Sequence, residues 1–272
     1  MLFQKKYHHE SITESFFECE RDGLTIHGTE YRPARSEDTK LPVAIVCHGF
    51  MAFQDTVHQY AQVLAELGYA AYCFDFCGGS VIRGKSDGRT TDMSVLTELR
   101  DLEAVMEFTR SRPYNDPGKL LLMGCSQGGF VSALAAAKYP DAVSKLVLFY
   151  PALCIPDDAR AGKMMFARFD PQDIPERINC GPMKLGRCYA ADVVNMDPYK
   201  EISGYGGDVL LVHGTRDFIV KPEYSKRAEE VYRSCGANVT LKFIEGGSHG
   251  FSKKHDQIAI GMLKDFVGDF LE

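Results

Sequence analysis

The chain has 272 residues, of which 45% are hydrophobic and 25% are charged, a balance typical of a globular protein. Its formal net charge of −6 argues against a nucleic-acid partner. No apolar run approaches the roughly 20 residues of a membrane helix, and residues 1–10 lack an apolar signal core. We therefore expect a cytoplasmic protein with one domain over residues 1–272 and no membrane partner.

The first half of the chain begins with a predicted β-hairpin. The strand-like runs Phe16–Glu20 and Leu24–Tyr31 flank an Asp22-Gly23 pair, which is typical of a tight hairpin turn. The run Val43–Cys47 is apolar throughout, as expected for a strand that is buried on both faces of a parallel sheet. A helical pattern follows from Val57 to Leu67.

Strand and helix patterns then alternate through the rest of the chain. Further strands are predicted at Tyr69–Phe76, Lys119–Met123, Lys145–Phe149, Val209–His213 and Val239–Ile244. Further helices are predicted from Asp92, as N-cap, to Met106, and over Gln127–Lys138, Pro222–Arg233 and Asp256–Leu271. This alternation predicts an α/β fold with a mostly parallel sheet, to which the N-terminal hairpin adds antiparallel edge strands.

One long segment, between Tyr150 and Val209, lacks this alternation. It is rich in methionine, aromatic residues and proline, and a structureless loop of that length is uncommon in a compact domain. We predict a small inserted cap with short helices over residues 152–205. Ligands of open α/β sheets bind at the carboxyl ends of the strands, so we expect the cap to form part of the pocket; alternatively, it only covers the sheet edge.

A candidate nucleophile follows the apolar strand that ends near Met123. The sequence Gly124-Cys125-Ser126-Gln127-Gly128 has the G-x-S-x-G form of a nucleophile elbow between a strand and a helix. The two glycines relieve crowding at a strained turn, and the helix N-terminus favours developing negative charge near Ser126. The alternative is a glycine-rich strand-to-helix turn in which the serine has no catalytic role. We expect Cys125 to point beneath the turn, away from the chemistry.

A serine hydroxyl needs a base and an orienting carboxylate to become a nucleophile. Asp217 and His249 each follow a later predicted strand, and the order Ser126, Asp217, His249 is that of an α/β-hydrolase triad. Rival residues for the acid and base are Asp75, Asp208, Glu245 and His213. Asp208 precedes its strand and so lies at the other sheet edge, whereas His213 is very close to Asp217 in sequence.

The oxyanion hole needs two N–H donors. We predict the amides of Gln127 and of Phe50, the latter in the loop His48-Gly49-Phe50. Met51 and Phe251, with Phe50, Phe53 and cap residues, are predicted to bind the substrate's acyl group. The nine scattered cysteines contain no C-x-x-C pair, which predicts free thiols. No His, Asp and Glu cluster has ligand spacing, so we expect no metal and no cofactor.

Together these motifs resemble those of α/β-hydrolases, and in particular the cinnamoyl (feruloyl) esterase-like branch, with a peptidase branch close by. The four motifs are His48-Gly49-Phe50, Gly124-Cys125-Ser126-Gln127-Gly128, Gly214-Thr215-Arg216-Asp217 and Gly246-Gly247-Ser248-His249-Gly250. The resemblance implies the fold, a serine nucleophile, no cofactor, oxyanion donors at Phe50 and Gln127, and a lid that helps to bind an aromatic acyl group. Phe76-Cys77-Gly78-Gly79-Ser80 departs from the Gly-His-Gly type of loop usual there.

The predicted function is that of a serine esterase that hydrolyses a small carboxylic ester, with an aromatic acyl group as one option, through an acyl-enzyme. A second hypothesis is an aminopeptidase or acyl-peptide hydrolase. A third, of another class, is a ligand-binding scaffold without catalysis. A lipase is less expected, because no long apolar lid is evident. Acyl preference and a homo-oligomeric state are left open by the sequence.

Overall fold

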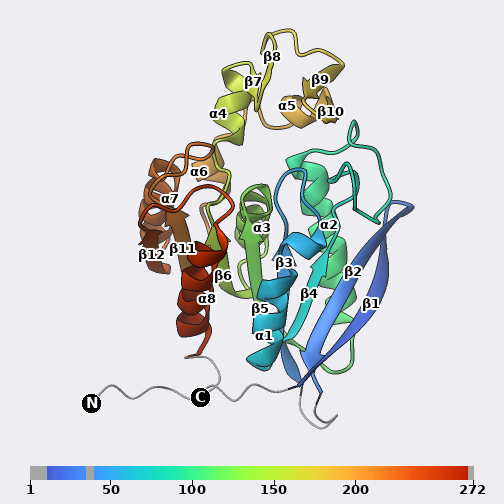
Figure 1. Cartoon of the computed structure of the whole chain (residues 1–272), viewed down its shortest axis with the longest axis vertical. Coiled ribbons are helices and arrows are strands. Elements are labelled where there is room, and N and C mark those ends of the chain that lie inside the picture. Colours follow the sequence, from blue (N-terminus) through green and yellow to red (C-terminus); the bar gives the residue numbers. More distant parts are fainter. Residues whose placement is uncertain (1–10, 35–39, 269–272) are drawn as a thin grey trace.

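The computed structural model describes residues 11–34 and 40–268, and within these ranges eight strands form one sheet in the order β1-β2-β4-β3-β5-β6-β11-β12 (Figure 1). The strands are β1 (Ile12–Arg21), β2 (Leu24–Pro33), β3 (Leu41–Cys47), β4 (Ala70–Phe74), β5 (Asn115–Cys125), β6 (Val143–Phe149), β11 (Asp208–Gly214) and β12 (Asn238–Ile244). From β4 to β12 neighbouring strands are parallel.

The predicted N-terminal hairpin forms the antiparallel edge of this sheet. Strands β1 and β2 pair in antiparallel register, and β2 also runs antiparallel to β4. The turn residues Asp22 and Gly23 have φ of 54° and 77°, which is the left-handed region that a tight hairpin turn requires at both central positions. The mostly parallel sheet with an N-terminal antiparallel hairpin is therefore confirmed.

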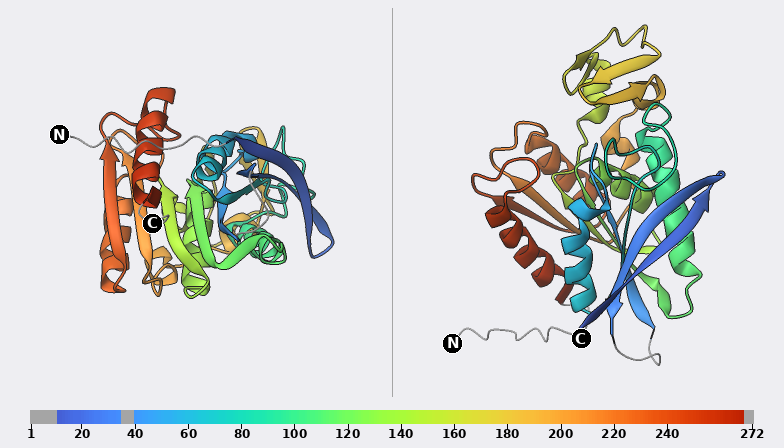
Figure 2. Two further views of the ribbon diagram at one scale, coloured as in Figure 1. Left: turned by 90° about the horizontal axis from the view of Figure 1, so that it is seen from below. Right: turned by 45° about the vertical axis from the view of Figure 1, so that its right-hand side comes forward.

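Both faces of the sheet are covered by helices, which explains why its central strands are apolar throughout. Along β3, Ile45 and Cys47 pack in the core on one face, whereas Ala44 and Val46 pack in the core on the other. Helices α2 (Val95–Arg110), α3 (Gln127–Lys138) and α7 (Glu223–Ser234) contribute to the first core, and α1 (His58–Glu66) and α8 (Lys253–Gly268) to the second (Figure 2).

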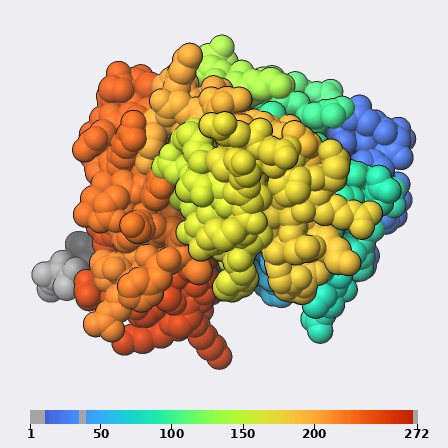
Figure 3. All heavy atoms as spheres, turned by 90° about the horizontal axis from the view of Figure 1, so that it is seen from above, coloured from blue at the N-terminus to red at the C-terminus, as the bar shows by residue number. Residues whose placement is uncertain are grey.

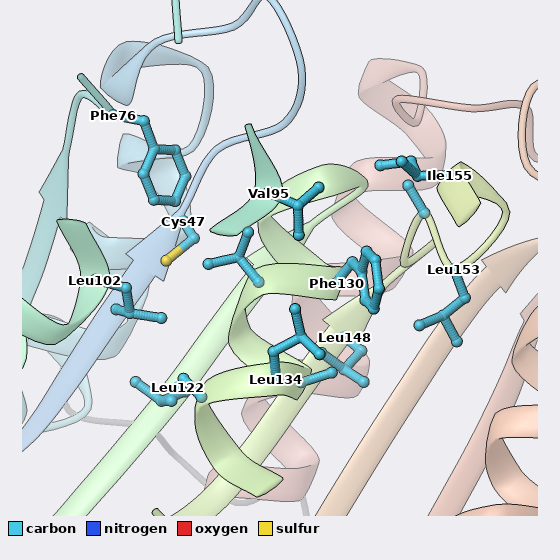
Figure 4. Packing of buried hydrophobic residues seen from close by; sticks show 14 of the residues in the cluster. Cys47, Phe76, Val95, Leu102, Leu122, Phe130, Leu134, Leu148, Leu153 and Ile155 are labelled. Atoms are coloured by element: carbon cyan, nitrogen blue, oxygen red, sulfur yellow. The ribbon is translucent and has the colours of Figure 1, made fainter. Parts of the chain in front are cut away.

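The first core is continuous from the middle of the sheet to the start of the 152–205 segment. Phe130 and Leu134 of α3 pack in one cluster with Leu122 and Leu148 of the strands and with Leu153 beyond β6 (Figure 4). All five side chains are buried, so α3, and with it the turn that precedes this helix, is fixed to the sheet by close packing.

Two helix boundaries differ from the prediction. Helix α2 is capped by Ser94, whose side chain accepts a hydrogen bond from the Thr97 amide, and not by Asp92. Asp92 instead pairs with Arg89. Helix α8 begins at Lys253, three positions before the predicted start. Its predicted end at Leu271 lies outside the described residues. Residues 1–10, which were assessed for a signal sequence, also lie outside them.

The 152–205 segment lies above the carboxyl ends of the parallel strands (Figure 1) and covers the middle of the molecule when seen from above (Figure 3). Its elements are α4 (Ile155–Arg160), β7 (Lys163–Met164), β8 (Ala167–Arg168), β9 (Arg177–Cys180), β10 (Met183–Gly186), α5 (Cys188–Ala191) and α6 (Pro198–Glu201). The strands form two small antiparallel pairs, β7 with β8 and β9 with β10. The segment thus contains strands as well as the short helices that were predicted.

The described part of the chain contains no helix whose length and apolar character would let it cross a bilayer. All nine cysteines are free thiols.

Candidate active site

Ser126 lies at the sharp turn between β5 and α3. Its φ of 54° and ψ of −119° are unusual for a residue with a side chain, and such strain is found at functional sites. The flanking glycines are required by close backbone approach. A Cβ on Gly124 would lie 2.1 Å from the Gly128 carbonyl oxygen, and one on Gly128 would lie 2.2 Å from the His48 carbonyl oxygen.

The three predicted triad residues form one hydrogen-bonded line. His249 Nε2 lies 2.9 Å from Ser126 Oγ, and His249 Nδ1 lies 2.8 Å from Asp217 Oδ2. Because a carboxylate only accepts hydrogen bonds, Nδ1 carries the proton and Nε2 is free to accept the serine proton. Asp217 follows β11 and His249 follows β12, so neighbouring parallel strands deliver both side chains to the same sheet edge as Ser126.

The carboxylate of Asp217 is buried, and both of its oxygens accept hydrogen bonds. Its Oδ1 accepts hydrogen bonds from the amides of Ile219 and Val220, each at 2.9 Å. Burial alone would raise the pKa of Asp217, but hydrogen bonds from His213 and His249 and the charge of His249 outweigh burial and bring this pKa well below its usual range. Asp217 is therefore ionised at neutral pH and able to orient His249.

The rival acids have other partners. Asp208 pairs with Lys145 at the opposite sheet edge, and Asp75 accepts hydrogen bonds from the Gln54 and Lys85 amides. Glu245 is exposed. Among the contacts of the described residues, Asp217 alone of these carboxylates hydrogen-bonds to His249.

The loop after β3 lies directly beside Ser126. A Cβ on Gly49 would lie 3.1 Å from Ser126 Cβ, so glycine is needed for this approach. His48 Nε2 accepts a hydrogen bond from the Phe76 amide, which leaves Nδ1 as the donor to the Gly49 carbonyl oxygen at 2.8 Å. In a trans peptide the N–H points opposite to the C=O, so this bond turns the Phe50 N–H away from His48.

Burial of His48 lowers its pKa, in spite of the Gly49 hydrogen bond and the Asp75 charge, which act in the opposite direction. The ring therefore stays neutral at pH 7 and keeps one acceptor and one donor nitrogen. The sequence contained a signal that His48 orients the predicted oxyanion loop, because His48 is the first residue of His48-Gly49-Phe50.

Tyr150, which the sequence reasoning did not single out, supports His249 from the end of β6. Its ring packs edge-on against the imidazole with 4.8 Å between centroids, and its φ of 39° is strained for an aromatic residue. Behind it, Cys125 is buried, and burial raises the pKa of its thiol to about 12. Cys125 thus stays a neutral thiol beneath the turn.

A first hollow, here called the cap-side hollow, opens between Ser126 and the 152–205 segment. Its walls are mostly apolar and include residues of the loop after Asp217. The lining residues are Phe50, Ser126, Gln127, Ala152, Cys154, Ile155, Asp158, Lys163, Met164, Met165, Phe166, Tyr189, Phe218, Ile219 and Val220. Asp158 and Lys163 add one ion pair, at 3.4 Å, to this apolar wall.

A second hollow, here called the histidine-side hollow, lies on the other side of Ser126 and has a more polar wall. It is lined by Gly49, Phe50, Ala52, Thr56, Val57, Gln59, Tyr60, Cys125, Ser126, Tyr150, His249, Gly250, Phe251, Lys253 and Asp256. Phe251, which was predicted for the acyl site, lines this hollow. Met51 and Phe53 are among the described residues that line neither hollow, and Met51 packs against the first core.

This sheet, with a strained serine at its carboxyl edge and a histidine and an aspartate from the two following strands, defines an α/β-hydrolase. The chain belongs to the family described as serine aminopeptidase, S33, whose model matches residues 40–178, just over half of the chain. It is thus a hydrolase, and its resemblance to the esterase-like branch is confirmed by a solved structure of Est1E from Butyrivibrio proteoclasticus with ferulic acid bound. That structure shares 27% identity and a TM-score of 0.85, covering 94% of this chain and 99% of Est1E.

Two curated relatives are peptidases by name. The chain is 24% identical to the uncharacterised peptidase YuxL of Bacillus subtilis, covering 89% of this chain and 36% of YuxL. It is also 24% identical to the acylamino-acid-releasing enzyme of Sus scrofa, covering 85% of this chain and 32% of that enzyme. The chain thus spans about a third of the length of these two relatives.

Proposed function

We propose that this protein is a serine esterase that hydrolyses esters of a small apolar, aromatic acid through an acyl-enzyme. The observation that carries the proposal is the continuous hydrogen-bonded line Asp217–His249–Ser126 at the junction of two hollows. Such a line generates a nucleophile at neutral pH, because the imidazole accepts the serine proton while the carboxylate stabilises the resulting cation.

In the proposed reaction Ser126 Oγ attacks the ester carbonyl carbon and its proton passes to His249 Nε2. The amides of Phe50 and Gln127 donate to the oxyanion of the tetrahedral intermediate. When the C–O bond to the alcohol breaks, His249 returns the proton to the departing oxygen. A water molecule then attacks the acyl-enzyme by the same steps, which releases the acid and restores Ser126.

The positions of the two hollows support an assignment of the substrate's halves. His249 must reach the departing alcohol oxygen, and this residue lines the histidine-side hollow only. The alcohol half therefore belongs there, and the acyl half belongs in the apolar cap-side hollow. The resemblance to Est1E, whose structure contains ferulic acid, supports an aromatic acid as the acyl half and a role of residues 152–205 as a cap.

The test is turnover of methyl ferulate, with an aliphatic ester of similar size for comparison, by the purified chain. We expect faster hydrolysis of the aromatic ester, stoichiometric labelling by a fluorophosphonate, and loss of both activities in Ser126→Ala. Unchanged hydrolysis by Ser126→Ala would contradict the mechanism. An unlabelled wild-type chain that binds ferulate without turnover would support a non-catalytic scaffold.

A peptidase is the second candidate, favoured by the family description and by the names of the two curated relatives. The same residues would then cleave an amide, and the histidine-side hollow would receive the departing amine. Comparing kcat/KM for an acyl-amino-acid anilide with that for the matched ester separates the two proposals. A higher value for the amide, after correction for the intrinsic reactivity of the two bonds, would favour the peptidase.

A further inference from the structure

A second imidazole contacts the carboxylate of Asp217. His213 lies near the end of β11, four residues before Asp217, and is 0% exposed. Its Nε2 lies 3.3 Å from Asp217 Oδ2, the same oxygen that accepts the 2.8 Å hydrogen bond from His249 Nδ1. Two histidine rings, one from strand β11 and one from the loop after β12, thus converge on one carboxylate oxygen.

The surroundings of His213 fix which of its nitrogens carries the proton. Nε2 lies 2.9 Å from the Val220 carbonyl oxygen, which only accepts hydrogen bonds, so Nε2 must be protonated. Nδ1 lies 2.7 Å from Ser225 Oγ, whose hydroxyl can donate to it. The Nε2–H of the ring therefore lies between the Val220 carbonyl and Asp217, and both ring nitrogens have polar partners.

This geometry excludes His213 as the general base. It is buried, lines neither hollow, and its ring nitrogens contact Asp217, Val220 and Ser225 among the described residues, and not Ser126. Any effect of His213 on the reaction must therefore pass through Asp217.

We infer that His213 is a positioning residue of the reaction: its Nε2–H holds the Asp217 carboxylate in the rotamer that His249 needs and withdraws part of its negative charge from His249. The inference rests on the proposed serine mechanism. The other groups that face Asp217 are the Ile219 and Val220 amides on its own loop, His249 from the loop after β12, and Tyr150 from the end of β6. Among all the groups named, only His213 and His249 contact Asp217 Oδ2.

Two consequences follow for a variant without this N–H. The carboxylate loses one of its four N–H contacts and orients His249 less well, so kcat falls. The remaining negative charge acts more strongly on the His249 N–H and favours the imidazolium, so the acid limb of the pH profile of kcat/KM moves to higher pH. KM changes less than kcat, because His213 lines neither hollow and contacts the cap-side wall only through the Val220 carbonyl.

The experiment compares His213→Leu, which removes the N–H, with His213→Gln, which retains a side-chain N–H donor. Thr109→Val serves as a control, since it deletes a buried hydroxyl bonded to the Met106 carbonyl on α2, remote from the triad. We expect His213→Leu to lower kcat about tenfold, as for loss of one hydrogen bond to a charged group, with the acid limb displaced upward. His213→Gln should recover most of kcat and the wild-type acid limb, and Thr109→Val should match the wild type in both.

If His213→Leu does not fold, Ser225→Ala takes its place, because it removes the partner of Nδ1 and loosens the same ring. We then expect a smaller fall in kcat and a smaller displacement of the acid limb in the same direction. A folded His213→Leu with the wild-type kcat and pH profile would overturn the inference, and so would an equal loss in the leucine and glutamine variants without a change of the acid limb. Failure of the proposed function looks different: the wild-type chain itself would then neither react with a fluorophosphonate nor hydrolyse the ester.

Discussion

The hydroxyl of Tyr189 donates a hydrogen bond to the side-chain oxygen of Gln127. Tyr189 belongs to the 152–205 segment and Gln127 is the first residue of α3, directly after Ser126. Both side chains are buried, and Tyr189 also packs against Phe50 with 5.5 Å between ring centroids. The segment above the sheet is therefore bound to both residues that we propose as oxyanion donors.

Removing this hydroxyl should destabilise the protein. In Tyr189→Phe the buried Gln127 oxygen loses its donor, so we expect the free energy of unfolding to fall by about 1–3 kcal/mol, together with a lower kcat. Urea denaturation measures the first effect and ester turnover the second. Tyr224→Phe is the matched control, because its hydroxyl bonds to exposed Asp157. Equal losses of stability in both variants would contradict a special role for the Tyr189 contact.

The approach of Gly49 to Ser126 predicts a second effect. In Gly49→Ala the new methyl group would lie 3.1 Å from Ser126 Cβ and 3.3 Å from the Cys125 carbonyl oxygen, so the loop or the serine must move. Since a displacement of about 1 Å can cost a hundredfold in rate, we expect kcat to fall by at least an order of magnitude. Gly261→Ala in α8, where an added Cβ meets nothing within 4 Å, should keep full activity.

The outer wall of the cap-side hollow can be tested at Phe218, which is 89% exposed and yet lines this hollow. Truncation to alanine removes apolar contact area from the bound acyl group and little from the protein core. We therefore expect KM for an aromatic acyl ester to rise roughly fivefold without a change in unfolding free energy. Ile82→Ala, at an 82% exposed residue outside the hollow, should leave KM unaltered, and a similar rise there would contradict the assignment.

A buried acid below the Ser126 turn predicts a dependence of stability on pH. Burial raises the pKa of Glu98 well above its usual range, against the opposing effect of a hydrogen bond with the Gln127 side chain, and the Asp101 charge raises it further. Below the unfolded-state pKa of about 4.3 both states are protonated and Glu98 carries no penalty. As the pH rises above that value, only the unfolded state releases the proton, so the folded state loses stability.

Glu98→Gln should remove this loss. We expect the variant to gain stability over the wild type as the pH rises from about 4.5, by at most about 1.4 kcal/mol per pH unit, until the buried carboxyl itself ionises. Urea titrations between pH 4.5 and 8 measure the difference. A constant difference across this range would show that Glu98 is already ionised in the folded protein.

The sheet and the hydrogen-bonded line of Asp217, His249 and Ser126 could be predicted because local sequence patterns determine them. The apolar run of β3 requires a strand covered on both faces. Gly124 is needed by a backbone contact within its own strand-turn-helix unit, and Gly128 by the approach of the loop after β3. The order of Ser126, Asp217 and His249 then follows from parallel strands that end at one sheet edge. The predicted start of α2 was wrong because Asp92 and Ser94 are both residue types that favour the N-cap position. The structure shows that Ser94 is the one whose side chain accepts a hydrogen bond from the Thr97 amide.

The lining of the hollows could not be predicted, because it depends on contacts between distant segments. Tyr189 reaches Gln127 across 62 positions of sequence, and no periodicity reports such a contact. Met51 has a φ of 61° and packs, partly buried, against the first core, and no sequence pattern indicates this conformation. Phe251 lines the histidine-side hollow, and motif order alone does not indicate which of the two hollows a loop residue faces.

The two hollows meet only at Ser126 and Phe50, and otherwise draw their walls from different stretches of the chain. Apart from Gln127, the rest of the cap-side wall comes from residues 152–189 and 218–220. Apart from Cys125 and Tyr150, the rest of the histidine-side wall comes from residues 49–60 and 249–256. With the proposed assignment of the substrate's halves, selectivity for the acid and for the alcohol can therefore evolve independently. Exchanging residues 152–189 with those of a related hydrolase should then change the choice of acid and leave the choice of alcohol as it is.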